Sequence, residues 1–92
     1  MTGALHYPFP PAQAYALNRC LYAIKSDPMF CTRFHADAAA ATSEMALTPA
    51  ERAALAVFDL AEIVRLGGHP YLVFMADLRL KMTREPTTLE YF

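Results

Sequence analysis

Apolar residues recur every three or four positions along most of this chain, which is the period of a helix with one buried face. The first such stretch covers residues 12–26. Arg19 and Lys25 lie among its apolar positions, which are Tyr15, Leu17, Leu21, Tyr22 and Ile24. No stretch of useful length alternates between apolar and polar residues as a half-buried strand would. The pattern therefore predicts an all-α protein.

A second helix is predicted for residues 28–41. Asp27 can accept hydrogen bonds from the free N–H groups at its start, and Pro28 suits the first helical position because its missing donor is no loss there. Arg33 and Asp37 lie four residues apart, and this spacing allows an ion pair on one helix face.

A third helix is predicted for residues 49–66. Thr48 and Glu51 have the spacing of a capping box at its start, and Gly67 supplies the left-handed residue that commonly follows a helix. We expect Gly68 to loosen the turn that comes next. The apolar positions expected to be buried are Leu55, Phe58, Leu60, Ile63 and Val64.

The fourth predicted helix, residues 70–82, is apolar nearly all round. Its apolar residues are Tyr71, Phe74, Met75 and Leu78 on one face and Leu72, Val73, Ala76 and Leu80 over much of the rest. Residues 1–11 and the tail of residues 83–92 contain prolines and are expected to be extended arms. Together these elements predict a single domain, residues 1–92, folded as a small all-α bundle of about four helices.

The composition indicates more apolar side chains than such a bundle can bury. The chain has 92 residues, 55% of them hydrophobic, whereas a chain of this size buries roughly 60–70% of the surface that its unfolded form exposes. We therefore expect apolar surface to remain outside, above all on the fourth helix. The formal net charge is −1 and Lys and Arg do not cluster, which argues against nucleic acid or an anionic membrane as partner.

Targeting and redox signals point to the cytoplasm. No uninterrupted apolar run reaches the ~18 residues of a membrane span, and the first residues lack the pattern of a secretory signal. The two cysteines are too few for the disulfide framework of a small secreted domain. A cytoplasmic protein without a membrane segment is expected.

The strongest candidate for metal chemistry is the H-x-D pair of His35 and Asp37, because that spacing forms half of a 2-His-1-carboxylate iron site. On a helix, residues two apart point about 200° away from each other, so a solvated helix face is the favoured interpretation. For His69, capping of the fourth helix or simple exposure is favoured over contact with a ligand. Cys20 and Cys31 lie in apolar helical stripes and are expected to be buried rather than reactive. We expect no catalytic apparatus, metal or other cofactor in this chain.

Three segments, taken in order and spacing, resemble a known family. They are LNRCLYAIKSDPMFCTRFHAD, LTPAERAALAVFD and LGGHPYLV, and together they are similar to the small (alpha) subunit of protocatechuate 4,5-dioxygenase and its relatives. The resemblance covers roughly residues 15–78. Its most specific elements are Leu17-Asn18, the Arg33-Phe34 pair followed by Asp37, the helix capped by Thr48 and Glu51 that leads to Asp59, and Gly67-Gly68.

The resemblance implies an all-helical subunit without catalytic residues of its own. In this family a separate large (beta) subunit, or a fused domain, holds the Fe(II) that opens catechol-type rings next to the hydroxyl pair with O₂. The small subunit packs over the mouth of that site. We therefore expect this chain to bind a large subunit and to help enclose its aromatic substrate. The residues expected to contact the partner or line the substrate mouth are Gly67, Gly68, His69, Pro70, Tyr71, Phe74 and Met75.

Some alternatives remain open. A stand-alone helical interaction or regulatory module derived from that family would self-associate as a homo-oligomer, or bind another protein, through the same face. An independent metalloenzyme would instead need His35 as a ligand. In the first arm, Tyr7 and Phe9 either pack onto the domain or reach the partner. After residue 82 the chain is shorter than the protocatechuate enzyme's subunit, which makes it more similar to small subunits that serve bulkier, uncharged catechols or aminophenols.

Overall fold

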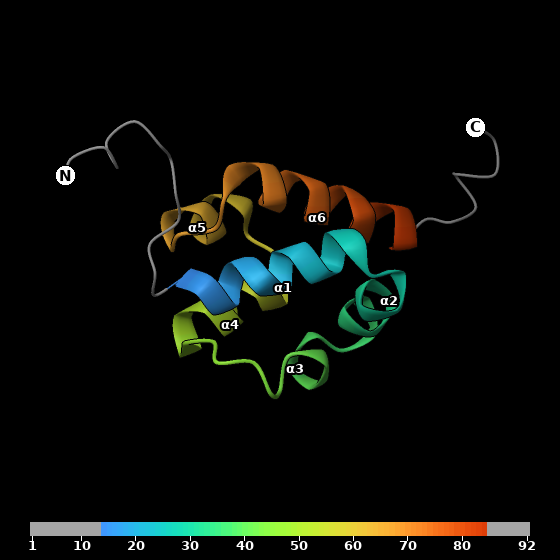
Figure 1. Cartoon of the computed structure of the whole chain (residues 1–92), viewed down its shortest axis with the longest axis horizontal. Helices are drawn as coiled ribbons and strands as arrows, with labels where there is room; N and C mark the ends of the chain where they lie inside the picture. Colours follow the sequence, from blue (N-terminus) through green and yellow to red (C-terminus); the bar gives the residue numbers. More distant parts are fainter. Residues whose placement is uncertain (1–13, 85–92) are drawn as a thin grey trace.

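The computed structural model describes residues 14–84 (Figure 1), and this part of the chain contains helices and no strand, as the sequence predicts. The helices are α1 (Tyr15–Ser26), α2 (Pro28–Ala36), α3 (Ala38–Ala41), α4 (Pro49–Val57), α5 (Leu60–Arg65) and α6 (Pro70–Arg84). The arm predicted for residues 1–11 lies outside the described residues. So does most of the predicted tail, because α6 continues to Arg84 and the description ends there.

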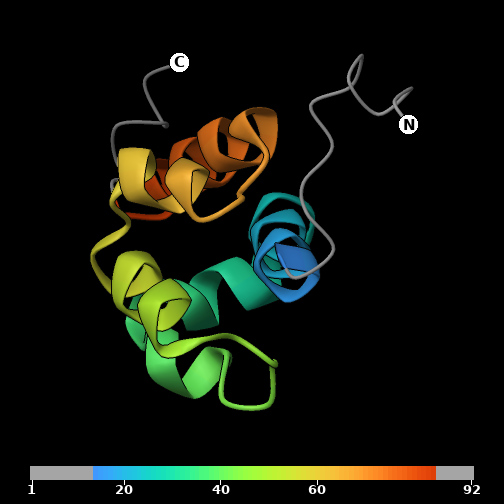
Figure 2. The same ribbon diagram turned by 90° about the vertical axis from the view of Figure 1, so that its left-hand side faces the viewer.

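The main helix pair of the bundle is α1 with α6. In Figure 1 the two run side by side along the length of the molecule, with α3 and α4 beneath them. The turned view of Figure 2 shows α5 and α6 on one side of the bundle and α3 and α4 on the other. The core lies between these layers, and its largest fully buried side chains are Leu17, Leu21, Ile24, Ile63 and Cys20.

The predicted helix of residues 28–41 is interrupted at Asp37. This residue has extended backbone angles (φ −159°, ψ 92°), and its carboxylate accepts a hydrogen bond from the Ala40 N–H at 3.1 Å, so it caps α3. Aspartate competes for backbone donors in this way and therefore favours helix starts over helix interiors. The ion pair between Arg33 and Asp37 that the helical spacing would allow does not form, because the Arg33 guanidinium lies over the Phe30 ring instead, 5.6 Å from its centroid.

The predicted helix of residues 49–66 is also two helices. Its start is as predicted: the Glu51 N–H donates to the Thr48 hydroxyl at 3.1 Å, and the Thr48 N–H donates to the Glu51 carboxylate at 2.9 Å. Its interior breaks after Val57, where Phe58 adopts the left-handed conformation (φ 48°, ψ 56°). Asp59 then caps α5 by accepting from the Glu62 N–H at 3.1 Å.

This break changes which apolar residues of the region are buried. Leu55 and Ile63 belong to the core, as predicted, and Phe58 is half-buried with its ring edge against Phe34, 6.3 Å between centroids. Leu60 and Val64 are exposed, so their predicted burial is wrong. The prediction extended one helical phase across residues 49–66, whereas α5 starts afresh at Leu60 and turns a different face inward.

The loop between α3 and α4 is held by Arg52. The guanidinium of this residue donates to the Thr42 carbonyl and hydroxyl oxygens, both at 3.2 Å, and to the Met45 carbonyl at 2.7 Å. Thr42 is buried, so these bonds satisfy polar atoms that water does not reach. Within residues 14–84, no helix is long and apolar enough to cross a membrane.

Candidate protein-binding surface

The turn between α5 and α6 is closed by a pair of backbone hydrogen bonds. The Gly67 N–H donates to the Val64 carbonyl at 3.0 Å and the Gly68 N–H donates to the Ile63 carbonyl at 2.8 Å, which is the Schellman arrangement at a helix end. Gly67 has a φ of 116°, a conformation that side chains with a Cβ rarely adopt. The prediction that Gly67 ends the helix is confirmed.

The prediction that Gly68 loosens the turn is wrong, because this residue instead allows the turn to close. The residue is buried, and a Cβ at this position would lie 2.8 Å from Ile63 Cγ2, 2.9 Å from the Ile63 carbonyl oxygen and 3.1 Å from Val73 Cγ2. These distances leave no room for a side chain. Gly68 therefore allows α5 and α6 to approach closely at the start of α6.

Asn18 ties this turn to α1 by two hydrogen bonds across the fold. Its Nδ2 donates to the Gly67 carbonyl at 3.0 Å, and its Oδ1 accepts from the His69 N–H at 2.8 Å. Nδ2 also donates to the carbonyl of Ala14, the residue just before α1, at 3.0 Å. The sequence reasoning missed this role. The signal was an asparagine beside the buried Leu17, in a helix interior where asparagine is unfavourable unless its amide has partners.

His69 begins α6 as a cap. Its Nδ1 accepts a hydrogen bond from the Tyr71 N–H at 3.1 Å, and Pro70 occupies the first helical position. Capping was one of the two interpretations that the sequence favoured, and it is confirmed. Together, the turn and the cap fix the direction in which α6 runs along the bundle.

Beyond this turn, α6 keeps a row of large apolar side chains outside the bundle. Tyr71 is 56% exposed and Phe74 63% exposed, and Leu78 lies on the same face one turn further on. We call these three residues the α6 ridge. Val73 and Ala76 turn into the core on the opposite face. The prediction that the last helix has more apolar surface than the chain can bury is confirmed for the described residues.

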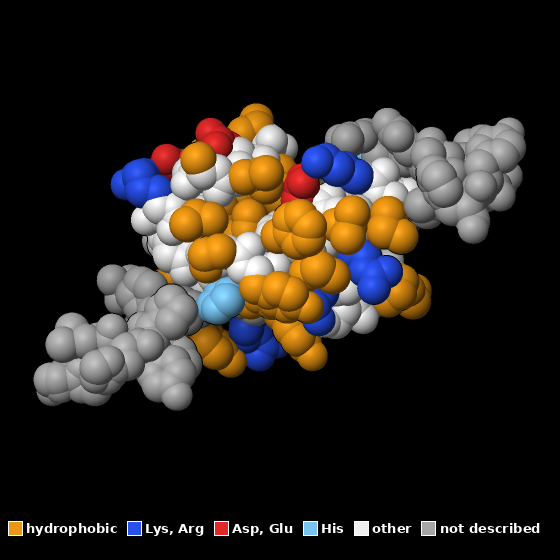
Figure 3. All heavy atoms as spheres, turned by 90° about the horizontal axis from the view of Figure 1, so that it is seen from above, with side chains coloured by type: hydrophobic (Ala, Val, Ile, Leu, Met, Phe, Trp, Pro, Cys, Tyr) orange, Lys and Arg blue, Asp and Glu red, His pale blue; other side chains and the backbone are white. Residues whose placement is uncertain are grey.

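A second row of exposed side chains borders the ridge on α1. Tyr15 and Tyr22 are both more than half exposed, the Arg19 guanidinium lies over the Tyr15 ring, and the Lys25 ammonium lies over the Tyr22 ring. Figure 3 shows hydrophobic side chains gathered over α6 and continuing onto α1, with Lys and Arg side chains among them. The two helices therefore form one face of mixed apolar and cationic character.

The candidate metal and nucleophile residues do not form a site. His35 is exposed on α2, whereas Asp37 caps α3, so the H-x-D pair is divided between two elements. Cys20 and Cys31 are buried, as predicted, and burial raises the pKa of the Cys20 thiol to about 12 despite the nearby Arg52 guanidinium. No three His, Cys, Asp or Glu side chains of residues 14–84 lie close enough to hold a metal ion.

Fold and surface define a small all-α protein with an exposed aromatic ridge beside a tightly hydrogen-bonded turn. A family model described as the aromatic-ring-opening dioxygenase LigAB, LigA subunit, matches residues 17–84, which run from α1 to the end of α6. The chain belongs to this family and is the small subunit of an aromatic-ring-opening dioxygenase, which implies a partner subunit. The family resemblance found in the sequence is thus confirmed. No curated protein and no solved structure matches the chain.

Proposed function

We propose that this chain packs on the iron-bearing large subunit of an extradiol ring-cleavage dioxygenase and covers its aromatic substrate site. Contact would be made by the α6 ridge and by Gly67, His69 and Pro70 of the turn, with Met75 beside them, while the buried Gly68 supports the turn from inside. The observation that carries the proposal is the exposure of Tyr71 and Phe74 on a helix that matches the small-subunit family.

The chemistry of the ridge suits a protein partner. Burying a large apolar side chain stabilises an assembly by about 1.5–3 kcal/mol, and aromatic residues are enriched among those that dominate binding energy. The ridge follows a turn that Gly68 and Asn18 hold in one conformation. Binding would therefore cost little ordering of the backbone, which favours affinity.

The part played by this chain would be enclosure rather than chemistry. The Fe(II) of the large subunit, when bound, supplies the activation of O₂ and of the catechol-type ring. A hydrophobic cover over the mouth of that site excludes water, which strengthens the electrostatic interactions inside it.

Reconstitution with the purified large subunit tests the proposal. Sedimentation of the mixture should show a stable complex of the two chains, and the rate of ring opening, followed by absorbance of the product, should rise when this chain is added. Absence of a complex together with an unchanged rate would contradict the proposal. A stable homo-oligomer of this chain alone, with the ridge inside it, would instead favour the interaction module.

A matched pair of variants locates the contact. Phe74→Asp places a charge on the ridge and should weaken the complex about 100-fold, because an interface aromatic is lost and a carboxylate is buried. Val57→Asp places the same charge on α4, at a side chain that is 76% exposed, and should change the affinity less than about twofold. Both variants should keep the thermal stability of the isolated chain, because both sites are exposed. Equal affinities for the two would show that the ridge is not the contact.

A further inference from the structure

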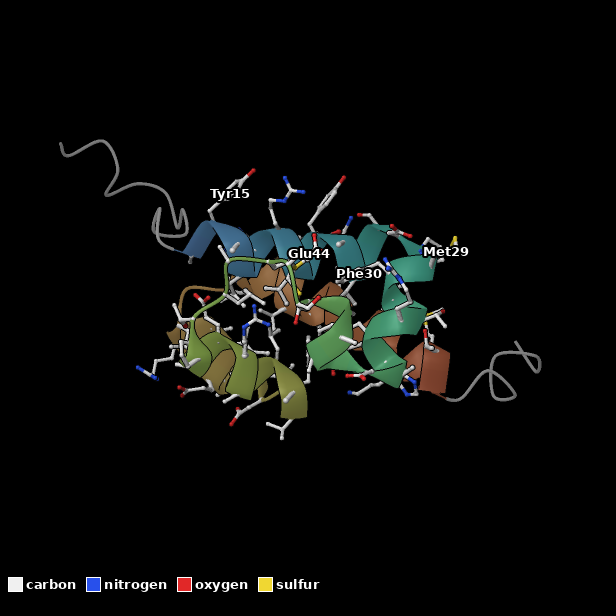
Figure 4. The ribbon with its side chains drawn as sticks, turned by 90° about the horizontal axis from the view of Figure 1, so that it is seen from below. Tyr15, Met29, Phe30 and Glu44 are labelled. Carbon is white, nitrogen blue, oxygen red and sulfur yellow. The ribbon has the colours of Figure 1, made fainter. Side chains whose placement is uncertain are left out.

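The outer face of α1 alternates aromatic and cationic side chains. Tyr15, Arg19, Tyr22 and Lys25, which we call the α1 row, follow one another at intervals of three and four residues, and α1 contains no aspartate or glutamate. The Arg19 Cζ lies 5.9 Å from the centroid of the Tyr15 ring, and the Lys25 Nζ lies 5.3 Å from the centroid of the Tyr22 ring. Figure 4 shows Tyr15 pointing away from the bundle at the start of the row.

No ion pair within residues 14–84 includes a cation of this row. The ion pairs of that part of the chain join Glu62 to Arg65 on α5 and Asp77 to Lys81 on α6. The carboxylate nearest in sequence, Asp27, is engaged as the cap of α2, where it accepts from the Met29 and Phe30 N–H groups. A soluble helix face commonly carries both signs of charge, whereas this one carries exposed rings and cations alone.

The row also has a shape that can receive a side chain. A shallow groove runs along it, lined by Tyr15, Asn18, Arg19, Tyr22 and Ala23. The Arg19 guanidinium lies beside the groove, where its Nη1 donates to the Tyr15 hydroxyl in a long hydrogen bond of 3.5 Å. A carboxylate that enters between the two tyrosine rings would therefore meet a guanidinium that can pair with it.

From this geometry we propose that the partner surface opposite α1 is acidic, with an aspartate or glutamate side chain that enters the groove to pair with Arg19 and another that pairs with Lys25 beyond the end of the groove. The proposal rests on the proposed function, because α1 and α6 pack side by side and a single large subunit would cover the outer surfaces of both; Figure 3 shows Lys and Arg side chains among the hydrophobic ones on the face seen there. The two surfaces then divide the work. The ridge supplies affinity by apolar burial, and the row steers and orients the partner by charge.

The dissociation constant of the complex with the large subunit, measured from about 0.05 M to about 0.5 M salt, tests this proposal. Arg19→Gln should weaken binding about tenfold at the low end, as expected for a lost charge-assisted hydrogen bond, and should flatten the dependence on salt. Arg33→Gln is the matched control, because Arg33 also lies over an aromatic ring but on α2. That control should bind within about twofold of the unchanged chain. Thermal unfolding should be the same for both variants.

Each other outcome counts against the proposal. If Arg19→Gln behaves as Arg33→Gln while Phe74→Asp still prevents assembly, the acidic contact is absent and the proposed function stands. If the unchanged chain forms no complex with the large subunit, both the acidic contact and the proposed function are wrong. If the effect of Arg19→Gln vanishes once Glu85 and Glu90 are changed to glutamine, the carboxylates belong to this chain's own tail and not to the partner.

Discussion

The turn before α5 and the turn after it are closed by the same pair of backbone hydrogen bonds, but with different residues in the left-handed position. After α4, the Phe58 N–H donates to the Leu55 carbonyl and the Asp59 N–H donates to the Ala54 carbonyl, which is the Schellman pattern found again after α5 at Gly67 and Gly68. At the second end the left-handed residue is glycine, whereas at the first it is phenylalanine. A left-handed conformation costs a residue with a Cβ about 1–2 kcal/mol, so the first end depends on compensating contacts.

The two ends also differ in what holds them to the rest of the fold. The hydrogen bonds around Phe58 and Asp59 are all local, and the longer-range contact there is the packing of the Phe58 ring on Phe34. The turn at Gly67 is joined to α1 through Asn18, 49 residues away along the chain. The chain therefore fixes the direction of α6 relative to α1 more firmly than that of α5 relative to α4.

This difference bears on which exposed apolar residues form an interface. Three exposed apolar residues lie near the break between α4 and α5, namely Val57, Leu60 and Val64. They are aliphatic and lie on two separate helices. The α6 ridge contains two aromatic residues on one continuous helix that begins at the fixed turn. Exposed apolar side chains that occur singly need no explanation, whereas an aromatic row on a fixed support has the character of a binding surface.

The largest change in the free energy of unfolding is expected when a side chain is placed inside the Gly67–Gly68 turn. Gly68→Val should lower the free energy of unfolding by about 3 kcal/mol, because its side chain would overlap Ile63 and Val73. Gly67→Val should lower it by about 2 kcal/mol through backbone strain at positive φ. The control Ala56→Val, at an exposed position of α4, should change it by less than about 0.5 kcal/mol. Urea unfolding measures all three, and a Gly68→Val protein as stable as the control would contradict the packing described here.

A smaller loss of stability is expected when the long-range hydrogen bonds of Asn18 are removed, and it can be compared with loss of the local cap made by Asp59. Asn18→Ala should lower the free energy of unfolding by about 1–2 kcal/mol, because the Gly67 carbonyl and the His69 N–H each lose a partner. Hydrogen exchange of the His69 amide should become faster in this variant.

Its counterpart at the other end is Asp59→Ala, which should cost about 1 kcal/mol through loss of the α5 cap. The His69 amide should exchange at its original rate in that variant, because the turn after α5 keeps its own bonds. Equal acceleration of His69 exchange in the two variants would mean that the ends of α5 are coupled and not independent.

How far the sequence predicts this fold depends on whether a helix end carries a side-chain signal. Asp27, the Thr48–Glu51 pair and Gly67 are residue types whose chemistry marks a helix end, and each acts as predicted. At the break after α4 the side-chain signal lies one residue later, at Asp59, which caps α5 as Asp27 caps α2, whereas nothing in the identity of a phenylalanine indicates positive φ at Phe58. Its ring packs on Phe34, a tertiary contact that the sequence does not reveal.

The candidate surface divides in the same way. The exposure of the α6 ridge follows from a helix that is apolar nearly all round, because a helix at the edge of a small bundle has one outward face. An asparagine inside a helix signals that its amide has partners, but the partners of Asn18 could not be predicted, since they lie about 50 residues away and only the finished fold brings them together. Asp37 is an intermediate case, because aspartate suits both an exposed helix position and a cap, and local backbone competition decides between them.

Side-chain footprinting of the chain with and without the large subunit tests the central claim most directly. Hydroxyl radicals label exposed side chains, and mass spectrometry reads the extent of labelling at each residue. On assembly, Tyr71 and Phe74 should become strongly protected, whereas Val57 on α4 should be labelled as in the isolated chain. Protection of Val57 with unchanged labelling of Tyr71 and Phe74 would contradict the account and place the contact at the other end of α5.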